Sequence, residues 1–279
     1  MPVSDVIEVS DLGADSLRWY RNLSRSGDHY RSGLFVAEGG KVVSRLLASP
    51  LALVSVLCSR DWYARLEPAL ADRAESIGVF LLEKPGVETL TGRSCYQPVK
   101  AVARIPESVS LEALLHDDQE AAMFVGLEGV SNAENVGAIV RNSAGLGASG
   151  LLVSRCASSP YLRRSVHASM GTIFQLPVVD SCDLIPTLGY LRSRGVRCLA
   201  AHPPATGQSL ARLDVPKRVC VVFGSEGQGL SPAVLAACDE AVGIPMAVGV
   251  DSLNVASSSA VFLYELQRNR DWMADCRAE

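Results

Sequence analysis

Along the first hundred residues, short apolar runs alternate with segments whose apolar positions have helical spacing. The short runs, which are apolar or rich in β-branched residues, predict strands at 34–37, 52–58, 79–82 and 99–105. Helices are predicted at 14–25, before the first of these strands, and at 41–47 and 62–74, between them. Alternation of strand and helix at this spacing is typical of an α/β layer.

The polar stretch 106–120 interrupts this pattern, so it is predicted to be a connection with one short helix, and we place a domain boundary there. Beyond it, residues 122–127 are apolar throughout, as expected of a strand buried on both faces of a sheet. Further strands are expected at 150–153, 173–179, 196–201, 218–223 and 241–244, and helices at 135–145, 161–168, 184–193, 232–237 and 253–267. The chain is therefore predicted to contain two α/β domains, residues 1–106 and 120–279.

Composition narrows the class of protein. Of the 279 residues, 48% are hydrophobic and 20% are charged, as in ordinary soluble globular proteins. The first residues lack a basic segment followed by an apolar one, and no apolar run approaches the roughly 20 residues that span a bilayer. We therefore expect a cytoplasmic protein without a membrane segment.

The eight cysteines and four histidines are dispersed along the chain. No pair of cysteines has the close local spacing that zinc sites normally show, so neither a metal site nor a disulfide framework is expected. Several cysteines lie in apolar runs, such as Cys220 between Val219 and Val221. Reduced thiols in the core are the better interpretation.

The net charge of −4 argues against a nucleic-acid partner, because phosphate-binding domains are usually basic. The distribution of arginines points the other way: four of them, Arg18, Arg21, Arg25 and Arg31, crowd one stretch that contains a single acid, Asp28. Arginine suits bidentate contacts with phosphate. A solvated helix face explains the same cluster equally well.

The first segment with candidate chemistry is 132–141, Asn-Ala-Glu-Asn-Val-Gly-Ala-Ile-Val-Arg. Its apolar residues have i, i+3, i+4 spacing and would face the sheet, with Asn135 as the N-cap of the helix. Arg141 lies one position beyond this stripe, about 100° around the helix, and would emerge at the edge of the core. A capped helix with an ordinary surface arginine explains this segment taken alone.

The second segment, 223–232, places three glycines directly after a predicted buried strand. Ligands of open α/β sheets bind in loops of this kind, at the carboxyl ends of strands. The glycines would let the backbone wrap around a ligand, and Glu226 is an acid in the tightest part of the loop. No Gly-Lys-Ser/Thr follows, so this is not a P-loop. A plain turn is the alternative.

The third segment runs from 244 to 254, Ile-Pro-Met-Ala-Val-Gly-Val-Asp-Ser-Leu-Asn. Asp251 is expected to cap the last helix, with Ser252 and Asn254 in its first turn beside unpaired backbone N–H groups. That helix is apolar on several faces, which predicts burial between the sheet and a second subunit. Capping alone explains Asp251 or Ser252, but not the three segments together.

These three segments, in this order and spacing, resemble the signature motifs of the SpoU (TrmH-like) branch of the SPOUT methyltransferase superfamily. The resemblance covers about 125–266 and includes a further similar segment, with Arg164 and Ser-Met-Gly-Thr at 169–172. Residues 35–39, Phe-Val-Ala-Glu-Gly, and the helix after them look like the family's L30e-like substrate-binding domain. Two features depart from the family: His167 stands where relatives often carry arginine, and the net charge is acidic.

The resemblance implies an RNA methyltransferase that moves a methyl group from S-adenosylmethionine to a ribose 2′-hydroxyl of rRNA or tRNA. It also implies a C-terminal α/β-knot, which is a parallel sheet whose last segment is threaded into a trefoil knot, after a small L30e-like domain. A homodimer with its active site at the subunit interface is expected, without a metal or a membrane partner. The implied cofactor-binding residues are Gly224, Ser225, Gly229, Ile244, Met246 and Leu253.

The same resemblance gives Arg141 the role of activating the hydroxyl. Because a guanidinium is almost never deprotonated in proteins, Arg141 is expected either to act as a base only when stacked against phosphate and cofactor, or to stabilise the alkoxide. The residues expected to orient Arg141 and the ribose are Asn135, Glu226, Ser252 and Asn254. The residues expected to bind RNA are Arg18, Arg21, Arg25, Arg31 and Arg164.

Two alternatives remain at this point. A non-catalytic RNA-binding protein could keep the knotted fold, although such a protein has no need to retain Arg141, Glu226, Ser252 and Asn254 together. Methylation of a base nitrogen by a related knotted enzyme is disfavoured by the Asn/Arg and Ser-Leu-Asn motifs. The 2′-hydroxyl separates RNA from DNA, so DNA is not an expected substrate.

Overall fold

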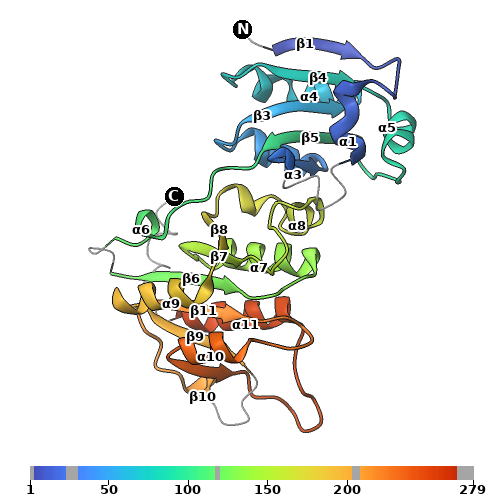
Figure 1. Cartoon of the computed structure of the whole chain (residues 1–279). Helices are drawn as coiled ribbons and strands as arrows, with labels where there is room; N and C mark the ends of the chain where they lie inside the picture. Colours follow the sequence, from blue (N-terminus) through green and yellow to red (C-terminus); the bar gives the residue numbers. More distant parts are fainter. Residues whose placement is uncertain (1–2, 23–30, 117–119, 203–207, 269–279) are drawn as a thin grey trace. The chain divides into compact units, whose positions relative to one another are not determined.

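The computed structural model describes residues 3–22, 31–116, 120–202 and 208–268. It divides into two compact units (Figure 1). Unit 1 contains Met1–Glu107 together with Pro160–Gln175, and unit 2 contains Ser108–Ser159 and Leu176–Glu279. The units thus differ from the predicted division in one respect, because the segment 160–175 lies with the N-terminal residues.

Unit 1 is built on a mixed sheet of strand order β1-β4-β3-β5-β2. The neighbours β1, β4 and β3 run parallel, and β5 is antiparallel to both β3 and β2. The strands are β1 (Val3–Glu8), β2 (Leu34–Glu38), β3 (Leu53–Cys58), β4 (Ile77–Leu81) and β5 (Val99–Arg104). The helices are α1 (Arg18–Asn22), α3 (Gly40–Leu47), α4 (Arg60–Ala71) and α5 (Lys84–Thr91), with the 3-10 turn η1 (Asp15–Leu17).

The apolar pattern located the interior strands of unit 1 and missed its periphery. The first four residues of β2 are buried, as are all but Val54 in β3, which is why their apolar runs were clear. The edge strand β1 carries exposed Val6 and Ile7 beside polar residues, so it gave no run. Helix α5 begins with Lys84-Pro85-Gly86 and buries only Val87 and Leu90, and was missed for that reason.

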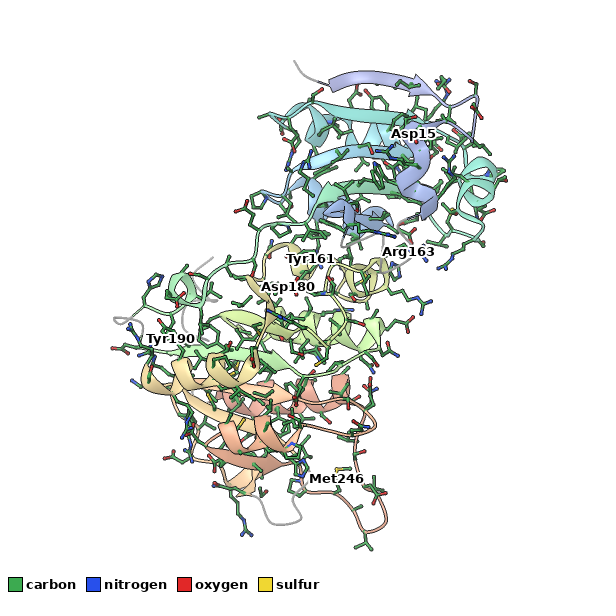
Figure 2. The ribbon with its side chains drawn as sticks, in the orientation of Figure 1. Asp15, Tyr161, Arg163, Asp180, Tyr190 and Met246 are labelled. Carbon is green, nitrogen blue, oxygen red and sulfur yellow. The ribbon has the colours of Figure 1, made fainter. Side chains whose placement is uncertain are left out.

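The segment Pro160–Gln175, called here the connecting segment, joins β7 to β8 and packs within unit 1. It contains helix α8 (Arg163–Ala168) and the 3-10 turn η2 (Thr172–Phe174). The rings of Tyr161 and Phe174 each lie 5.6 Å from the ring of Phe35 on β2. Tyr161 and Arg163, both in this segment, are labelled in Figure 2. The strand predicted at 173–179 was wrong in its first half, because these apolar residues cover β2 instead of pairing with a strand.

Unit 2 contains a seven-stranded sheet of order β10-β12-β9-β11-β6-β7-β8, in which every recorded strand pair is parallel. The strands are β6 (Ala122–Leu127), β7 (Gly150–Ser154), β8 (Val178–Cys182), β9 (Arg197–Ala201), β10 (Gln208–Ser209), β11 (Arg218–Phe223) and β12 (Glu240–Gly243). Every residue of β6 is buried, which confirms the predicted burial on both faces. The α/β fold with a parallel sheet is therefore confirmed.

Helices cover both faces of this sheet (Figure 1). Helices α9 and α10 share a core with the sheet that includes Phe124, Cys220 and Val222. Helices α7 and α11 pack against one another on the opposite face. The helices of unit 2 are α6 (Leu111–Leu114), α7 (Ala133–Gly145), α9 (Leu184–Ser193), α10 (Pro232–Ala237) and α11 (Val255–Arg268), with the 3-10 turn η3 (Leu210–Arg212).

Two predicted helix caps were wrong. Helix α7 is capped by Asn132, whose Oδ1 accepts hydrogen bonds from the backbone N–H groups of Glu134 (2.8 Å) and Asn135 (3.2 Å). Asn135 therefore lies in the first turn, with its side chain free for other partners. Helix α11 is capped by Asn254, which accepts from Ala256 N at 2.9 Å, and not by Asp251. In both helices the side-chain oxygen of an asparagine accepts from the otherwise unpaired backbone N–H groups of the first turn.

The cysteines in the described part of the chain are all free thiols. Hydrogen bonding with Cys198, together with burial, raises the pKa of the Cys220 thiol, which keeps it protonated in the core. Among the described residues, no cluster of three or more His, Cys, Asp or Glu side chains could hold a metal ion. In the same residues, no helix is both long and apolar enough to cross a membrane.

Candidate functional site

A cavity of about 510 Å³ lies in unit 2 where β9, β11 and β12 end. Because these strands are parallel, their carboxyl ends meet at one edge of the sheet, and the loops that follow them converge there. The described lining residues are Ala201, His202, Phe223, Gly224, Ser225, Glu226, Gly227, Gln228, Gly229, Gly243, Ile244, Met246, Asp251, Ser252, Leu253, Asn254, Val255, Ser258 and Phe262. The six residues expected to bind the cofactor are all among them.

The glycine-rich loop after β11 closes on itself. Ser225 N donates to Gly229 O at 3.1 Å and Gly229 N donates to Ser225 O at 3.0 Å, which folds residues 225–229 into a tight turn. At Gly224, a Cβ would lie 2.3 Å from the carbonyl carbon of Gly229, so only glycine fits. The turn requires a left-handed backbone at Gly229, with φ of 67°. The loop is therefore a rigid wall of the cavity.

The helix after this loop begins as the sequence predicted. Ser231 is the N-cap of α10, and its Oγ accepts from Val234 N at 3.3 Å. Glu128, which follows β6, accepts from the Ser231 hydroxyl at 2.7 Å and from Ser231 N at 2.8 Å. The carboxylate of Glu128 thus fixes the exit of the loop.

A chain of side-chain hydrogen bonds joins the three motifs. Asn135 Nδ2, on α7, donates to Glu226 Oε1 at 2.5 Å, and Asn254 Nδ2 donates to Asn135 Oδ1 at 3.2 Å. Since Asn254 also caps α11, the network connects the first turns of α7 and α11 to the glycine-rich loop. Three residues that are far apart in the sequence are thereby held at one end of the cavity.

Arg141 does not line the cavity. It is exposed on α7, directly after Ile139 and Val140, which are fully buried as predicted. It lies six positions after Asn135, about 9 Å along the helix axis. The next residue, Asn142, donates to Ala256 O and to Ser259 Oγ, both at 2.9 Å, and so ties α7 to α11. Arg141 therefore projects from a fixed helix, beyond the network.

The predicted RNA-binding arginines that the structure describes differ in their surroundings. Arg18 pairs with Asp15 at 2.7 Å and lies over the ring of Trp19 at 4.4 Å. Arg21 donates to the carbonyl oxygens of Leu12, Gly13 and Ala14, so it holds a turn. Arg31 and Arg164 are exposed. Arg25 lies outside the described residues.

Sequence reasoning missed several residues of the site. His202, at the carboxyl end of β9, lines the cavity, and the same rule that located the glycine-rich loop could have found it. Phe223 and Phe262 form an edge-to-face pair at 5.6 Å in the wall. Phe223 ends β11 at the start of the second segment, and Phe262 lies in the last helix, which was predicted to be buried, so neither was named as a binding residue. The acidic side chains of the described lining are Glu226 and Asp251.

Comparison with known proteins agrees with these motifs. Residues 122–264 match the model of the SpoU rRNA methylase family. An uncharacterised tRNA/rRNA methyltransferase of Mycobacterium tuberculosis is 31% identical over 276 residues, which cover 96% of this chain and 93% of the relative.

Solved structures share the fold over nearly the whole chain. A structure described as a putative RNA methyltransferase of the TrmH family from Porphyromonas gingivalis aligns with a TM-score of 0.79 at 25% identity, over 93% of this chain and 99% of that one. The SpoU methyltransferase AviRb from Streptomyces viridochromogenes, solved with the cofactor AdoMet, aligns with a TM-score of 0.79 at 23% identity, over 92% and 98%. The latter likeness concerns the fold. The chain therefore belongs to the SpoU rRNA methylase family, as its three motifs predicted.

Proposed function

We propose that this protein is a cytoplasmic RNA methyltransferase that uses S-adenosylmethionine to methylate a ribose 2′-hydroxyl of rRNA or tRNA. The observation that carries the proposal is the meeting of three distant motifs: the second and third line one cavity, and Asn135 of the first is hydrogen-bonded to Glu226 and Asn254 in its wall. Family membership supports RNA methylation, and the motif residues support the choice of the 2′-hydroxyl.

The cavity suits S-adenosylmethionine. Phe223, Ile244, Met246 and Leu253 offer apolar contact to an adenosyl group, and the backbone at Gly224 is approachable because no side chain covers it. Glu226 and Asp251 place carboxylates where a cationic ligand gains from them. Backbone groups of Gly224, Ile244 and Leu253 would hold the adenosine, with Ser225 and Gly229 shaping the loop around it.

Bound S-adenosylmethionine supplies an electrophilic methyl group, and the protein must align the ribose oxygen with it and take up the hydroxyl proton. Alignment can contribute roughly 7–11 kcal/mol to such a transfer. Asn135, Glu226, Ser252 and Asn254 would orient the ribose and the side chain of Arg141. Arg141 would stabilise the alkoxide as the hydroxyl proton leaves to water, or would accept that proton as a neutral guanidine that has first given up its own proton to solvent while stacked against an RNA phosphate and the cofactor.

The proposal includes a homodimer and a knotted arrangement of unit 2, with unit 1 as an L30e-like domain that binds the RNA. Two apolar side chains on α11, Val261 and Tyr264, are 41% and 63% exposed in the single chain. The loop before α11 exposes Val248 and Val250. A second copy packed on these residues would bury them and could bring its own RNA surface toward Arg141.

Methyl transfer by Arg141 variants tests the function. Purified protein with tritiated S-adenosylmethionine should label RNA from cells that lack this protein, at sites that resist alkaline hydrolysis, as 2′-O-methylated positions do. Arg141→Lys should lower kcat by about 100-fold, because an ammonium lacks the planar, multi-donor geometry with which the guanidinium would act as base or stabilise the alkoxide, while the cofactor Kd measured by calorimetry stays unchanged. Arg212→Lys, on another exposed arginine of unit 2, is the matched control.

Full activity of Arg141→Lys would refute both roles of Arg141. RNA binding without any labelled product would identify a non-catalytic RNA-binding protein. If alkaline hydrolysis releases the label in single nucleotides, and the label is recovered on the base of those nucleotides, the protein is a base methylase instead.

A further inference from the structure

The connecting segment carries a largely buried ion cluster within unit 1. Arg163 Nη1, on α8, donates to both carboxylate oxygens of Glu38, at 2.8 Å each. Lys100 Nζ forms an ion pair with the same carboxylate. The side chains of Lys100, Arg163 and Glu38 are only 5%, 17% and 20% exposed. One carboxylate thus joins a residue of β2, a residue of β5 and the first residue of α8.

The cluster contains two positive side chains, Lys100 and Arg163, and one carboxylate, Glu38. Burial alone would raise the pKa of Glu38, but Lys100 and Arg163 outweigh it and hold that pKa below its ordinary value, so the carboxylate stays ionised. Lys100 lies directly opposite Glu38 in the β2–β5 register and already neutralises it. The core of unit 1 therefore does not require Arg163, which instead ties the connecting segment to the sheet.

Two further contacts fix the same segment. The rings of Tyr161 and Phe174 pack on Phe35, at either end of the segment. Arg45 Nη1, on α3, donates to Met170 O at 2.7 Å, where the backbone has an unusual positive φ of 54°. A non-glycine residue persists in this conformation only when its surroundings hold it. The segment is therefore anchored at its start, its middle and its end.

Anchoring on one side determines what α8 presents on the other. Ser165 and Val166 are buried, whereas Arg164 and His167 are exposed. Positions i and i+3 share a face of a helix, so Arg164 and His167 form one outward edge. Adjacent arginines thus have opposite surroundings: Arg163 is held by Glu38 and Arg164 faces solvent.

We propose that Glu38 and Arg163 are positioning residues for RNA, which orient α8 so that Arg164 contacts the phosphate backbone of the substrate. This inference rests on the proposed function for the choice of RNA as ligand. It makes the connecting segment, although it lies within the sequence matched by the methylase family, a substrate-binding part of unit 1. Arg163 does not touch the RNA and acts through Arg164.

The test compares Arg163→Met, Arg164→Met and the double variant, with ribosomal RNA purified from cells that lack this protein as the probe. Glu38→Gln is unsuitable, because it leaves Lys100 buried without its counter-charge. Arg163→Met should raise the RNA KM, and the Kd from filter binding, roughly tenfold through misplacement of the contact. We expect kcat and the Kd for S-adenosylmethionine to stay within about twofold of the wild type. Arg163→Lys, which keeps the charge, should recover most of the affinity.

The double variant separates positioning from direct contact. If Arg163 acts through Arg164, removing it in the Arg164→Met background should weaken RNA binding no further. Multiplying effects, or an Arg163→Met protein with normal RNA affinity, would overturn the inference. If Arg163→Met does not fold, Phe174→Leu loosens the segment without a change of charge and should show the same dependence on Arg164.

The two proposals can fail separately. RNA binding that follows this pattern in a protein without methyl transfer would leave the inference standing and remove the function. Methyl transfer whose RNA KM is unchanged in Arg163→Met would leave the function standing and remove the inference.

Discussion

Two loops of unit 1 and the loops and helices beside the cavity of unit 2 are held in place by different chemical groups. In unit 1 these groups are guanidiniums. Arg73 donates to the carbonyl oxygens of Leu47, Ser49 and Leu51 and pairs with Glu75. Arg21 holds the turn at 12–14. In unit 2 the groups are asparagine side chains and a glycine. Asn132 and Asn254 cap α7 and α11, and Asn142 joins these two helices. Gly224 lets the two ends of the glycine-rich loop come into contact.

This difference follows from the properties of the groups. A guanidinium offers five donors and keeps its charge, so it can gather several carbonyl oxygens, but it is then occupied. An amide donates and accepts without net charge, so it can join a network beside a charged ligand and not compete with it. The density of arginines in unit 1 is therefore a poor measure of its affinity for RNA, since Arg21, Arg73 and Arg163 are structural ties.

The largest effect should come from Gly224, where unit 2 depends on backbone contact alone. Gly224→Ala places a methyl group 2.3 Å from the Gly229 carbonyl carbon, so the turn must open. Overpacking of this kind costs about 1–3 kcal/mol, and we expect the Kd for S-adenosylmethionine, measured by calorimetry, to rise about 100-fold.

Gly189→Ala is the matched control in the same unit, because Gly189 lies on α9 and does not line the cavity. A Cβ at Gly189 meets nothing within 4 Å, and its backbone does not have a left-handed φ. The variant should bind the cofactor within about twofold of the wild type, since open space imposes no steric cost. Equal losses in both variants would mean that unit 2 is sensitive to any added methyl group, and the close approach at Gly224 would not be the cause.

The position of Gly224 was accessible from the sequence, and the contacts of Arg21 were not. A buried apolar run followed by glycines has one common meaning in a parallel sheet, so the loop and its place at the strand ends could be predicted. A cluster of arginines has two meanings, and only the tertiary fold decides whether the carbonyl oxygens of 12–14 are within reach. The connecting segment was missed for the same reason, because its apolar residues have a partner more than a hundred residues away.

An intermediate effect is expected at Asn135, the centre of the network in unit 2. Asn135→Ala removes the donor to Glu226 and the acceptor for Asn254. Because these groups are exposed, stability should change little, while kcat should fall about tenfold through loss of one or two hydrogen bonds. Steady-state methyl transfer and a thermal melt distinguish the two quantities.

Asn142→Ala sharpens this prediction, since Asn142 is an amide on the same helix with a structural role. Its two bonds to α11 are partly buried, so their loss should cost about 1–2 kcal/mol of unfolding free energy. The kcat of the folded fraction should remain normal. A fall in kcat at Asn142 as large as that at Asn135 would place the network's role in stability and not in alignment.

The smallest effect concerns the arginine ties of unit 1. Hydrogen bonding from Arg73 lowers the pKa of Glu75 from 4.5 to about 2, against the opposing effect of burial. A carboxyl whose pKa is lower in the folded than in the unfolded protein stabilises the fold at pH values above its unfolded pKa. The contribution of Glu75 is therefore present above pH 4.5 and is lost as the pH falls toward 2. Water screens the pair, which limits the contribution to about 1 kcal/mol.

Glu75→Gln should therefore lower stability by this amount at pH 7 and make the urea midpoint less dependent on pH between 4.5 and 2. The glutamine can still accept from Leu53 N, which bonds to Glu75 Oε1 at 3.1 Å, so the loop itself should persist. An unchanged acid profile would show that the Arg73–Glu75 pair contributes nothing to the cohesion of unit 1.

The path of the chain through the connecting segment limits how the protein can be cut or exchanged. A fragment that starts at Ser108 would carry the rings of Tyr161 and Phe174, and the charge of Arg163, with no surface to receive them. A fragment that ends at Glu107 would leave the ring of Phe35 bare. A functional chimera consequently needs three crossovers, after Glu107, Ser159 and Gln175, so that residues 160–175 travel with the N-terminal unit they fold against.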